Sequence, residues 1–122
     1  DFEHRSFAQE LALCQRYYYR HAEGNGLSIT ENATQYSSSN MYLSVPLPVE
    51  MRAQPSVHTN NSSGYFIKYA NDSGTTFATI ALDGVTTPRL LCLYANVSGT
   101  AGHSCMIRCN NAAAFVAAQA EL

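Results

Sequence analysis

The chain has 122 residues, of which 46% are hydrophobic and 13% are charged, a balance typical of a folded globular protein. The formal net charge of −2, with Lys68 as the single lysine, argues against recognition of a nucleic acid through its phosphates. No apolar run approaches the roughly 20 residues that a membrane-spanning helix needs, so we expect no membrane insertion. A chain of this length is expected to form a single domain, residues 1–122, with its own core.

The first predicted element is a short helix that begins after Ser6. Ser6 and Gln9 have the spacing of a capping box, in which each side chain hydrogen bonds to the backbone amide of the other residue. The helix is expected to end near Arg16 or Tyr17, because the three tyrosines at 17–19 favour a pleated strand. The apolar positions of this helix recur at helical spacing and form one stripe. These positions are Phe7, Leu11, Cys14 and Tyr18.

The chain after the tyrosines has the pattern of short β-strands. Segments rich in Gly, Asn, Ser and Pro separate the apolar runs and predict turns. Short strands at this spacing are typical of an antiparallel sandwich or barrel. The chain is therefore predicted to be mainly β, an antiparallel, jelly-roll-like β-sandwich with one short N-terminal α-helix. The predicted strands cover residues 27–30, 41–45, 49–52, 56–59, 65–70, 75–82, 89–97 and 105–109.

Two segments have more than one interpretation. Residues 89–97 are apolar on both faces, so this strand either lies centrally in a two-layered structure or is covered by a neighbouring subunit. The tail at 112–120 is rich in alanine, which favours a helix. Phe115 and Val116, placed among small residues, also permit a strand there. Local propensity does not decide between helix and strand for this tail.

The four cysteines do not form a recognisable disulfide or metal motif. In one extended strand the Cα atoms of Cys105 and Cys109 lie about 13 Å apart, beyond the reach of a disulfide. With His103 these two cysteines make an H-x-C-x3-C pattern, for which a metal site is one interpretation and two buried hydrophobic residues on a strand face the other. The second is favoured, because a structural zinc site needs four well-placed ligands. The remaining cysteines are Cys14 and Cys92.

No motif for catalysis or cofactor binding is present. The sequence has no G-x-S-x-G, no glycine-rich phosphate loop and no H-E-x-x-H. No set of carboxylates or histidines is singled out by its spacing for acid–base work. We therefore predict no enzyme activity, no metal and no cofactor.

Loops rich in tyrosine, asparagine and serine are the feature that points to a function. A tyrosine ring supplies rigid contact area, and amides and hydroxyls supply adaptable hydrogen bonds. A sugar presents an apolar ring face and a rim of hydroxyl groups, so these groups suit a carbohydrate. The alternative for each tyrosine is a half-buried strand residue. The candidate carbohydrate-binding residues are Tyr36, Asn60, Asn61, Tyr65, Asn71 and Asp72.

Three motifs resemble one known family. "FEHRSFAQELALCQRYYYR" at 2–20 resembles R-S-x-x-x-E-L-A-L-C-Q-R-Y-Y, the signature that begins C-terminal domains of bacteriophage tail-fibre and tailspike-like proteins. "VPLPVEMRAQPSV" at 45–57 is similar to the family's P-V-x-M-R-x-x-P-(S/T)-V. "AAQAEL" at 117–122 resembles its x-A-D-A-E-L ending, with Gln119 where Asp is common. Residues 58–112 match no further motif of the family.

The resemblance implies the C-terminal tip domain of a longer fibre or spike protein. Such a domain is β-rich, assembles as a parallel homotrimer and attaches non-covalently to glycans on the host surface. The helix would follow the fibre shaft and pack its apolar stripe onto the sandwich. The protein would be made in the reducing bacterial cytoplasm, with free thiols, and displayed on the exterior of the virion. A trimerisation and folding cap with no ligand is the first alternative, and a glycan hydrolase or lyase is the second.

Overall fold

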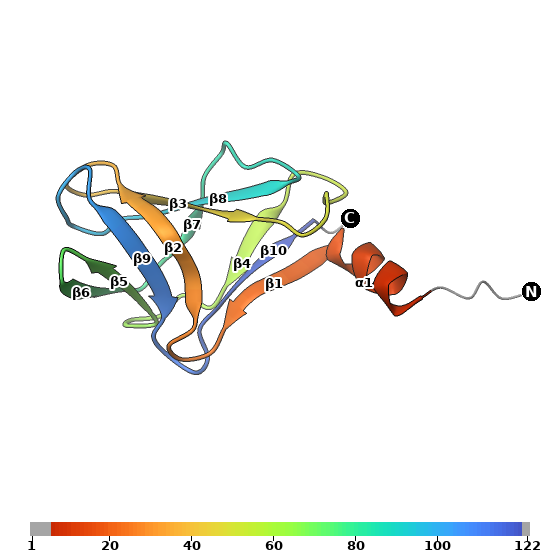
Figure 1. Cartoon of the computed structure of the whole chain (residues 1–122), viewed down its shortest axis with the longest axis horizontal. Helices are drawn as coiled ribbons and strands as arrows, with labels where there is room; N and C mark the ends of the chain where they lie inside the picture. Colours follow the sequence, from red (N-terminus) through yellow and green to blue (C-terminus); the bar gives the residue numbers. More distant parts are fainter. Residues whose placement is uncertain (1–5, 121–122) are drawn as a thin grey trace, which may run out of the picture.

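The computed structural model describes residues 6–120 of the protein, which contain one helix and ten strands (Figure 1). Residues 1–5 and 121–122, which include the ends of two of the family motifs, lie outside the described residues. The elements are α1 (Phe7–Gln15), β1 (Tyr18–Glu23), β2 (Ser28–Gln35), β3 (Met41–Pro46), β4 (Ser56–Thr59), β5 (Phe66–Ala70), β6 (Ser73–Phe77), β7 (Ala81–Leu82), β8 (Leu90–Ala95), β9 (Ser104–Cys109) and β10 (Phe115–Gln119).

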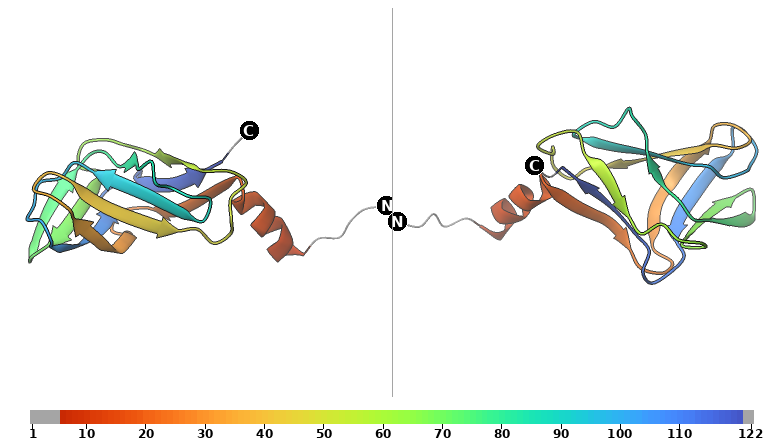
Figure 2. Two further views of the ribbon diagram at one scale, coloured as in Figure 1. Left: turned by 90° about the horizontal axis from the view of Figure 1, so that it is seen from above. Right: turned by 180° about the vertical axis from the view of Figure 1, so that it is seen from behind.

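The strands form two antiparallel sheets that share one core. A three-stranded sheet has the order β1-β10-β4, and a seven-stranded sheet has the order β6-β5-β9-β2-β3-β8-β7. The larger sheet curls, so that β7 at its edge contacts β4 of the smaller sheet (Figure 2). Phe66 is fully buried between the sheets and its ring stacks on Phe77, with 5.7 Å between the ring centroids. The predicted fold class, a mainly β antiparallel sandwich with one short N-terminal helix, is confirmed.

Helix α1 begins with the predicted capping box. The hydroxyl of Ser6 accepts a hydrogen bond from the Gln9 amide at 3.2 Å, and the side-chain oxygen of Gln9 accepts one from the Ser6 amide at 2.9 Å. The helix ends at Gln15 with Arg16 as its C-cap, as the sequence predicted. Within residues 6–120 no helix combines the length and the apolar composition that crossing a bilayer requires.

The prediction that the apolar stripe of α1 packs onto the sandwich is wrong. Phe7 is 82% exposed, Leu11 is 44% exposed, and no residue of the helix is buried. Figure 1 shows α1 standing off the end of the sheets. The reason is the path of the next strand: β1 starts at Tyr18 and pairs at once with β10, so the helix lies beyond the edge of the core. The C-terminal end of the helix is joined to the body of the protein by a hydrogen bond, in which the Arg52 amide donates to the Arg16 carbonyl at 3.0 Å.

Two of the predicted strands are wrong. Residues 49–52 form no strand, and Met51 is instead buried in a loop that lies between Pro48 and Pro55. Proline cannot donate to a strand ladder, so a run bounded by two prolines is a poor strand. Residues 75–82 are divided between β6 and β7, which lie at opposite edges of the seven-stranded sheet. The chain crosses from one edge to the other through the buried Ile80.

The structure shows the conformation of the tail and the place of residues 89–97 in the sheet. The alanine-rich tail forms β10, the central strand of the three-stranded sheet, and is paired with β1 and β4. Strand β8 lies inside the larger sheet between β3 and β7, with Leu91 and Leu93 fully buried and Tyr94 half-buried on the other face.

The hairpin of β5 and β6 occupies the end of the molecule opposite α1 (Figure 1). Its two-residue turn consists of Asn71 and Asp72, with φ of 51° and 62°. Positive φ at both central residues is the signature of a type I′ turn, which matches the twist of the strands. Asn and Asp tolerate this left-handed conformation better than other side chains, so the sequence fixes the hairpin locally.

Candidate functional site

A surface groove of about 430 Å³ lies on the outer face of the seven-stranded sheet, beside the β5–β6 turn. Its volume falls within the range of about 300–1,000 Å³ that small-molecule sites occupy. The groove is formed by β2, β9, β5 and β6, which are consecutive neighbours in the sheet. Its lining includes Glu31, Tyr69, Asn71, Asp72, Ser104 and Met106.

Tyr69 supplies the aromatic surface of the groove. It lies directly opposite Gly74 on β6 and Met106 on β9. A Cβ atom at position 74 would lie 3.2 Å from the Tyr69 ring, so the glycine makes room for the ring over the β6 backbone. The Arg108 guanidinium carbon lies 5.4 Å from the centroid of the same ring, within the range of a cation–π contact. The ring is therefore held in place by both neighbouring strands.

Glu31 places a carboxylate on the β2 side of the groove. Arg108 donates to one of its oxygens at 3.0 Å, and the Ser28 hydroxyl donates to the other at 2.6 Å. The hydrogen bond from Arg108, followed by that from Ser28, holds the pKa of Glu31 below its usual value. Glu31 is thus ionised at neutral pH and acts as a hydrogen-bond acceptor at the groove.

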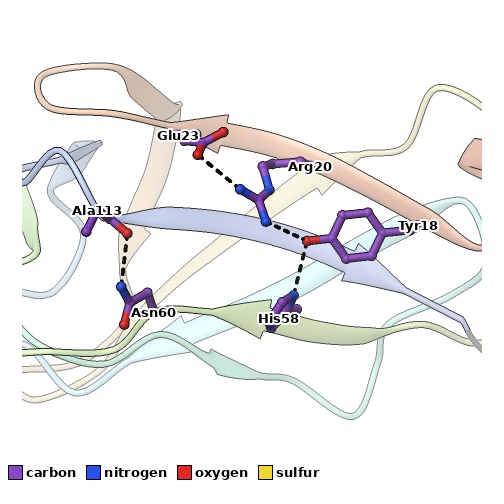
Figure 3. Close-up of polar contacts among 6 residues, drawn as sticks. All are labelled: Tyr18, Arg20, Glu23, His58, Asn60 and Ala113. Atoms are coloured by element: carbon purple, nitrogen blue, oxygen red, sulfur yellow. Dashed lines mark hydrogen bonds and ion pairs between the residues drawn. The ribbon is translucent and has the colours of Figure 1, made fainter.

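Asn71 and Asp72 are the two predicted site residues that line the groove. Asn60 and Asn61 lie elsewhere and are occupied by loop contacts. The Asn60 amide donates to the Ala113 carbonyl at 3.1 Å (Figure 3). The side-chain oxygen of Asn61 accepts from the Ile80 amide at 3.2 Å. These two asparagines fasten loops to the body of the protein.

The two remaining predicted residues are also outside the groove. Tyr65 is half-buried and packs against the core. Tyr36 is 71% exposed and makes an edge-to-face contact with Tyr42, with 5.4 Å between the ring centroids. Tyr42 in turn contacts Tyr94 at 6.1 Å. Tyr36 thus begins a separate row of tyrosines across β3 and β8.

A polar cluster on the outer face of the three-stranded sheet is a second place where functional groups gather (Figure 3). The Arg20 guanidinium lies 4.2 Å from the Phe115 ring centroid and donates to Glu23 at 3.0 Å. It also donates to the Tyr18 hydroxyl at 3.1 Å, the main cause of the raised pKa of Arg20. The same hydroxyl lies 3.1 Å from Nδ1 of His58. These contacts join β1 to β4 across β10.

The cysteines on β9 face the core, which confirms their interpretation as buried hydrophobic residues. Cys105 is 2% exposed and Cys109 is fully buried. Burial raises the pKa of the Cys109 thiol to about 11, with a smaller contribution from the charge of Glu23. In the described part of the chain, no three His, Cys, Asp or Glu side chains lie close enough to hold a metal ion.

The sequence pattern missed Tyr69, Glu31 and Met106, which line the groove beside the predicted turn residues. It also missed Arg108, which contacts both Tyr69 and Glu31. The alternation of β9 could have placed Met106 on the outer face, opposite the buried cysteines. Comparisons with protein-family models, with curated proteins and with solved structures find no match to the chain.

Proposed function

We propose that the chain is the receptor-binding tip domain of a bacteriophage tail fibre, and that its groove attaches non-covalently to carbohydrate on the bacterial surface. The observation that carries the proposal is the groove itself. It places a fixed tyrosine ring beside an amide and two carboxylates, Asn71, Asp72 and Glu31. The resemblance of three sequence motifs to phage tail-fibre domains supports this biological context.

The chemistry of the groove fits a sugar. The ring of Tyr69 can cover the apolar face of a pyranose, while Asn71 donates and accepts hydrogen bonds. Asp72 and Glu31 accept hydrogen bonds from hydroxyl groups. The β-sheet and its neighbouring contacts already hold Tyr69 and Glu31, so binding costs little conformational entropy at these positions.

The position of the groove fits attachment. The groove adjoins the β5–β6 turn, at the end of the molecule opposite α1 (Figure 1). A domain that is joined to a shaft through α1 would therefore present the groove away from the shaft. This arrangement suits a tip that meets a surface.

The substitution Tyr69→Ala is expected to weaken binding at least tenfold, equivalent to about 1.4 kcal/mol, because the sugar loses its aromatic platform. The measurement is binding of the labelled chain to an array of purified bacterial surface polysaccharides. Tyr36→Ala is the matched control, since Tyr36 is exposed and lies outside the groove. Asp72→Asn is a second variant, which removes a carboxylate while asparagine preserves the turn.

Three results would contradict the proposal. Loss of binding in Tyr36→Ala but not in Tyr69→Ala would place the site on the β2–β3 loop. Shortened polysaccharide chains after incubation would indicate a hydrolase or lyase. Absence of binding to every polysaccharide on the array would favour the alternative that the domain is a trimerisation cap with no ligand.

That structural alternative is a trimerisation cap, and the exposure of α1 favours it. Phe7 and Leu11 remain 82% and 44% exposed among the described residues. We infer that the equivalent helices of further copies of this chain cover them, because each copy offers the same stripe. Assembly of this kind is compatible with attachment: three weak sites on one fibre would raise apparent affinity by about 100-fold or more.

The double substitution Phe7→Ser/Leu11→Ser is expected to convert a trimer to a monomer in sedimentation-velocity experiments. Val85→Ser is the control, since Val85 is 67% exposed in a loop remote in sequence from α1. A monomeric wild-type chain would disprove the self-association of α1. A trimer that binds polysaccharide no better than the monomeric variant would disprove the contribution of multivalency.

A further inference from the structure

Lys68 is a buried lysine whose partners are all neutral. Its side chain lies on the core-facing side of β5 next to Phe66, and the residue is only 4% exposed. Its ammonium group donates to the side-chain oxygen of Gln35 at 3.0 Å and to the Ser98 carbonyl at 2.7 Å. Within residues 6–120 no Asp or Glu forms an ion pair with it. A buried ammonium without a counter-charge lowers the stability of the folded protein.

A small polar pocket of about 180 Å³ opens beside Lys68, between the β5–β6 hairpin and the loop after β8. It is smaller than a typical small-molecule site, so it has room for one compact group. The lining contains Lys68 and His103 together with the hydroxyl groups of Thr75 and Thr100, and it contains no Asp or Glu. The pocket therefore offers hydrogen-bond donors around a positive charge.

The surroundings of the ammonium are built to hold it in place. Gln35 is 1% exposed, and its amide nitrogen donates to the Val97 carbonyl at 2.7 Å, which fixes the oxygen that faces Lys68. A Cβ atom at Gly99 would lie 2.6 Å from the Lys68 ammonium nitrogen. Only a glycine at this position leaves room for the ammonium beneath the loop. The charge is thus pre-positioned at the wall of the pocket.

We propose that this pocket binds a carboxylate group. An ammonium has three N–H donors, and Gln35 and Ser98 use two of them, so one remains for an oxygen in the pocket. The carboxylate supplies the missing counter-charge, and the hydroxyls of Thr75 and Thr100 donate to its oxygens. The ligand is either a free small organic acid or the carboxylate of an acidic sugar. The pocket meets the groove at the β5–β6 turn, where both are lined by Ala70, Asn71 and Ser73. The proposal itself rests on Lys68, whose side chain lies on the opposite face of β5 from Tyr69.

The test is an NMR titration of the ¹⁵N-labelled chain with sodium acetate, sodium glucuronate, acetamide, glucose and sodium phosphate at constant ionic strength. Acetate and glucuronate are expected to shift the amide signals of residues 98–100 in a saturable manner, while acetamide and glucose leave them unchanged. Glucuronate binding at least tenfold tighter than acetate identifies an acidic sugar, and equal affinities identify a free acid. Tighter binding of phosphate than of either carboxylate would overturn the proposed ligand class.

Two variants connect the titration to the pocket. Lys68→Met is expected to abolish the acetate response. Thr75→Val keeps every hydrogen bond of Lys68 and is expected to weaken acetate binding at least threefold. This variant tests the pocket even if Lys68→Met does not fold. Thr76→Val is the control, because Thr76 is the next residue on β6 and points to the opposite face. Acetate shifts that do not saturate, or that persist in both Lys68→Met and Thr75→Val, would show that Lys68 only connects β5 to β2 and to the loop after β8. Tyr69→Ala reports on the groove, whereas Lys68→Met and Thr75→Val report on the pocket, so the two proposals can fail independently.

Discussion

Replacing Gln35 with leucine is expected to lower the free energy of unfolding by about 3 kcal/mol. The buried amide nitrogen of Gln35 donates to the carbonyls of Ser37, Asn40 and Val97, at 2.8, 3.2 and 2.7 Å. Its oxygen accepts from Lys68 at 3.0 Å. Leucine fills a similar volume but forms none of these hydrogen bonds. The substitution therefore leaves buried carbonyls and a buried ammonium with fewer partners.

The measurement is urea denaturation followed by circular dichroism. Thr34→Leu is the matched control, because Thr34 is the preceding residue on β2 and is exposed. The double variant Gln35→Leu/Lys68→Met is expected to lose at least about 1 kcal/mol less unfolding free energy than the two single variants lose in sum. The reason is that Lys68→Met removes the ammonium that Gln35→Leu leaves without its partner. A Gln35→Leu variant within about 0.5 kcal/mol of the wild type would show that this network contributes little to stability.

The substitution Ala118→Leu is expected to cost about 2 kcal/mol of stability. Ala118 is fully buried on β10, directly opposite Tyr19 on β1 and Val57 on β4. Side chains that face each other across a strand pair have Cβ atoms only about 5 Å apart. A leucine between two larger neighbours must displace one of them or distort the sheet.

The control for this substitution is Ala113→Leu, in the exposed loop before the same strand. Urea denaturation of the two variants separates the effect of core packing from the effect of replacing an alanine with leucine in an exposed position. The loop variant is expected to remain within about 0.5 kcal/mol of the wild type. Equal stabilities for the two variants would contradict the close packing of β10.

The parts of the fold that could be predicted from the sequence are those fixed by local interactions. The capping box of Ser6 and Gln9 involves neighbours in sequence, and the bounds of the strand at 56–59 were predicted correctly. The division of residues 75–82 could not be predicted, because the β propensity is continuous there. The chain leaves one sheet edge for the other only because the sheet curls, which is a long-range property.

The same distinction applies to the functional groups. The turn at Asn71 and Asp72 could be predicted, because both residue types favour turns and tolerate a positive φ. The ion pair between Glu31 and Arg108 could not, since it depends on the pairing of β2 with β9, whose register is interrupted by irregularities. The burial of Lys68 follows from its position two residues after Phe66, on the same face of β5, although its charge favoured an exposed position.

The antiparallel pairing of β1 with β10 has a mechanical consequence. Helix α1 leads almost directly into β1, so tension applied through the helix acts along the axis of that strand. The hydrogen bonds to β10 run across this axis, and they are therefore loaded together, in shear, rather than broken one after another. Since β10 is anchored on its other side by β4, a pull on the helix is shared by the whole smaller sheet. The connection between α1 and the smaller sheet is thus suited to bearing load.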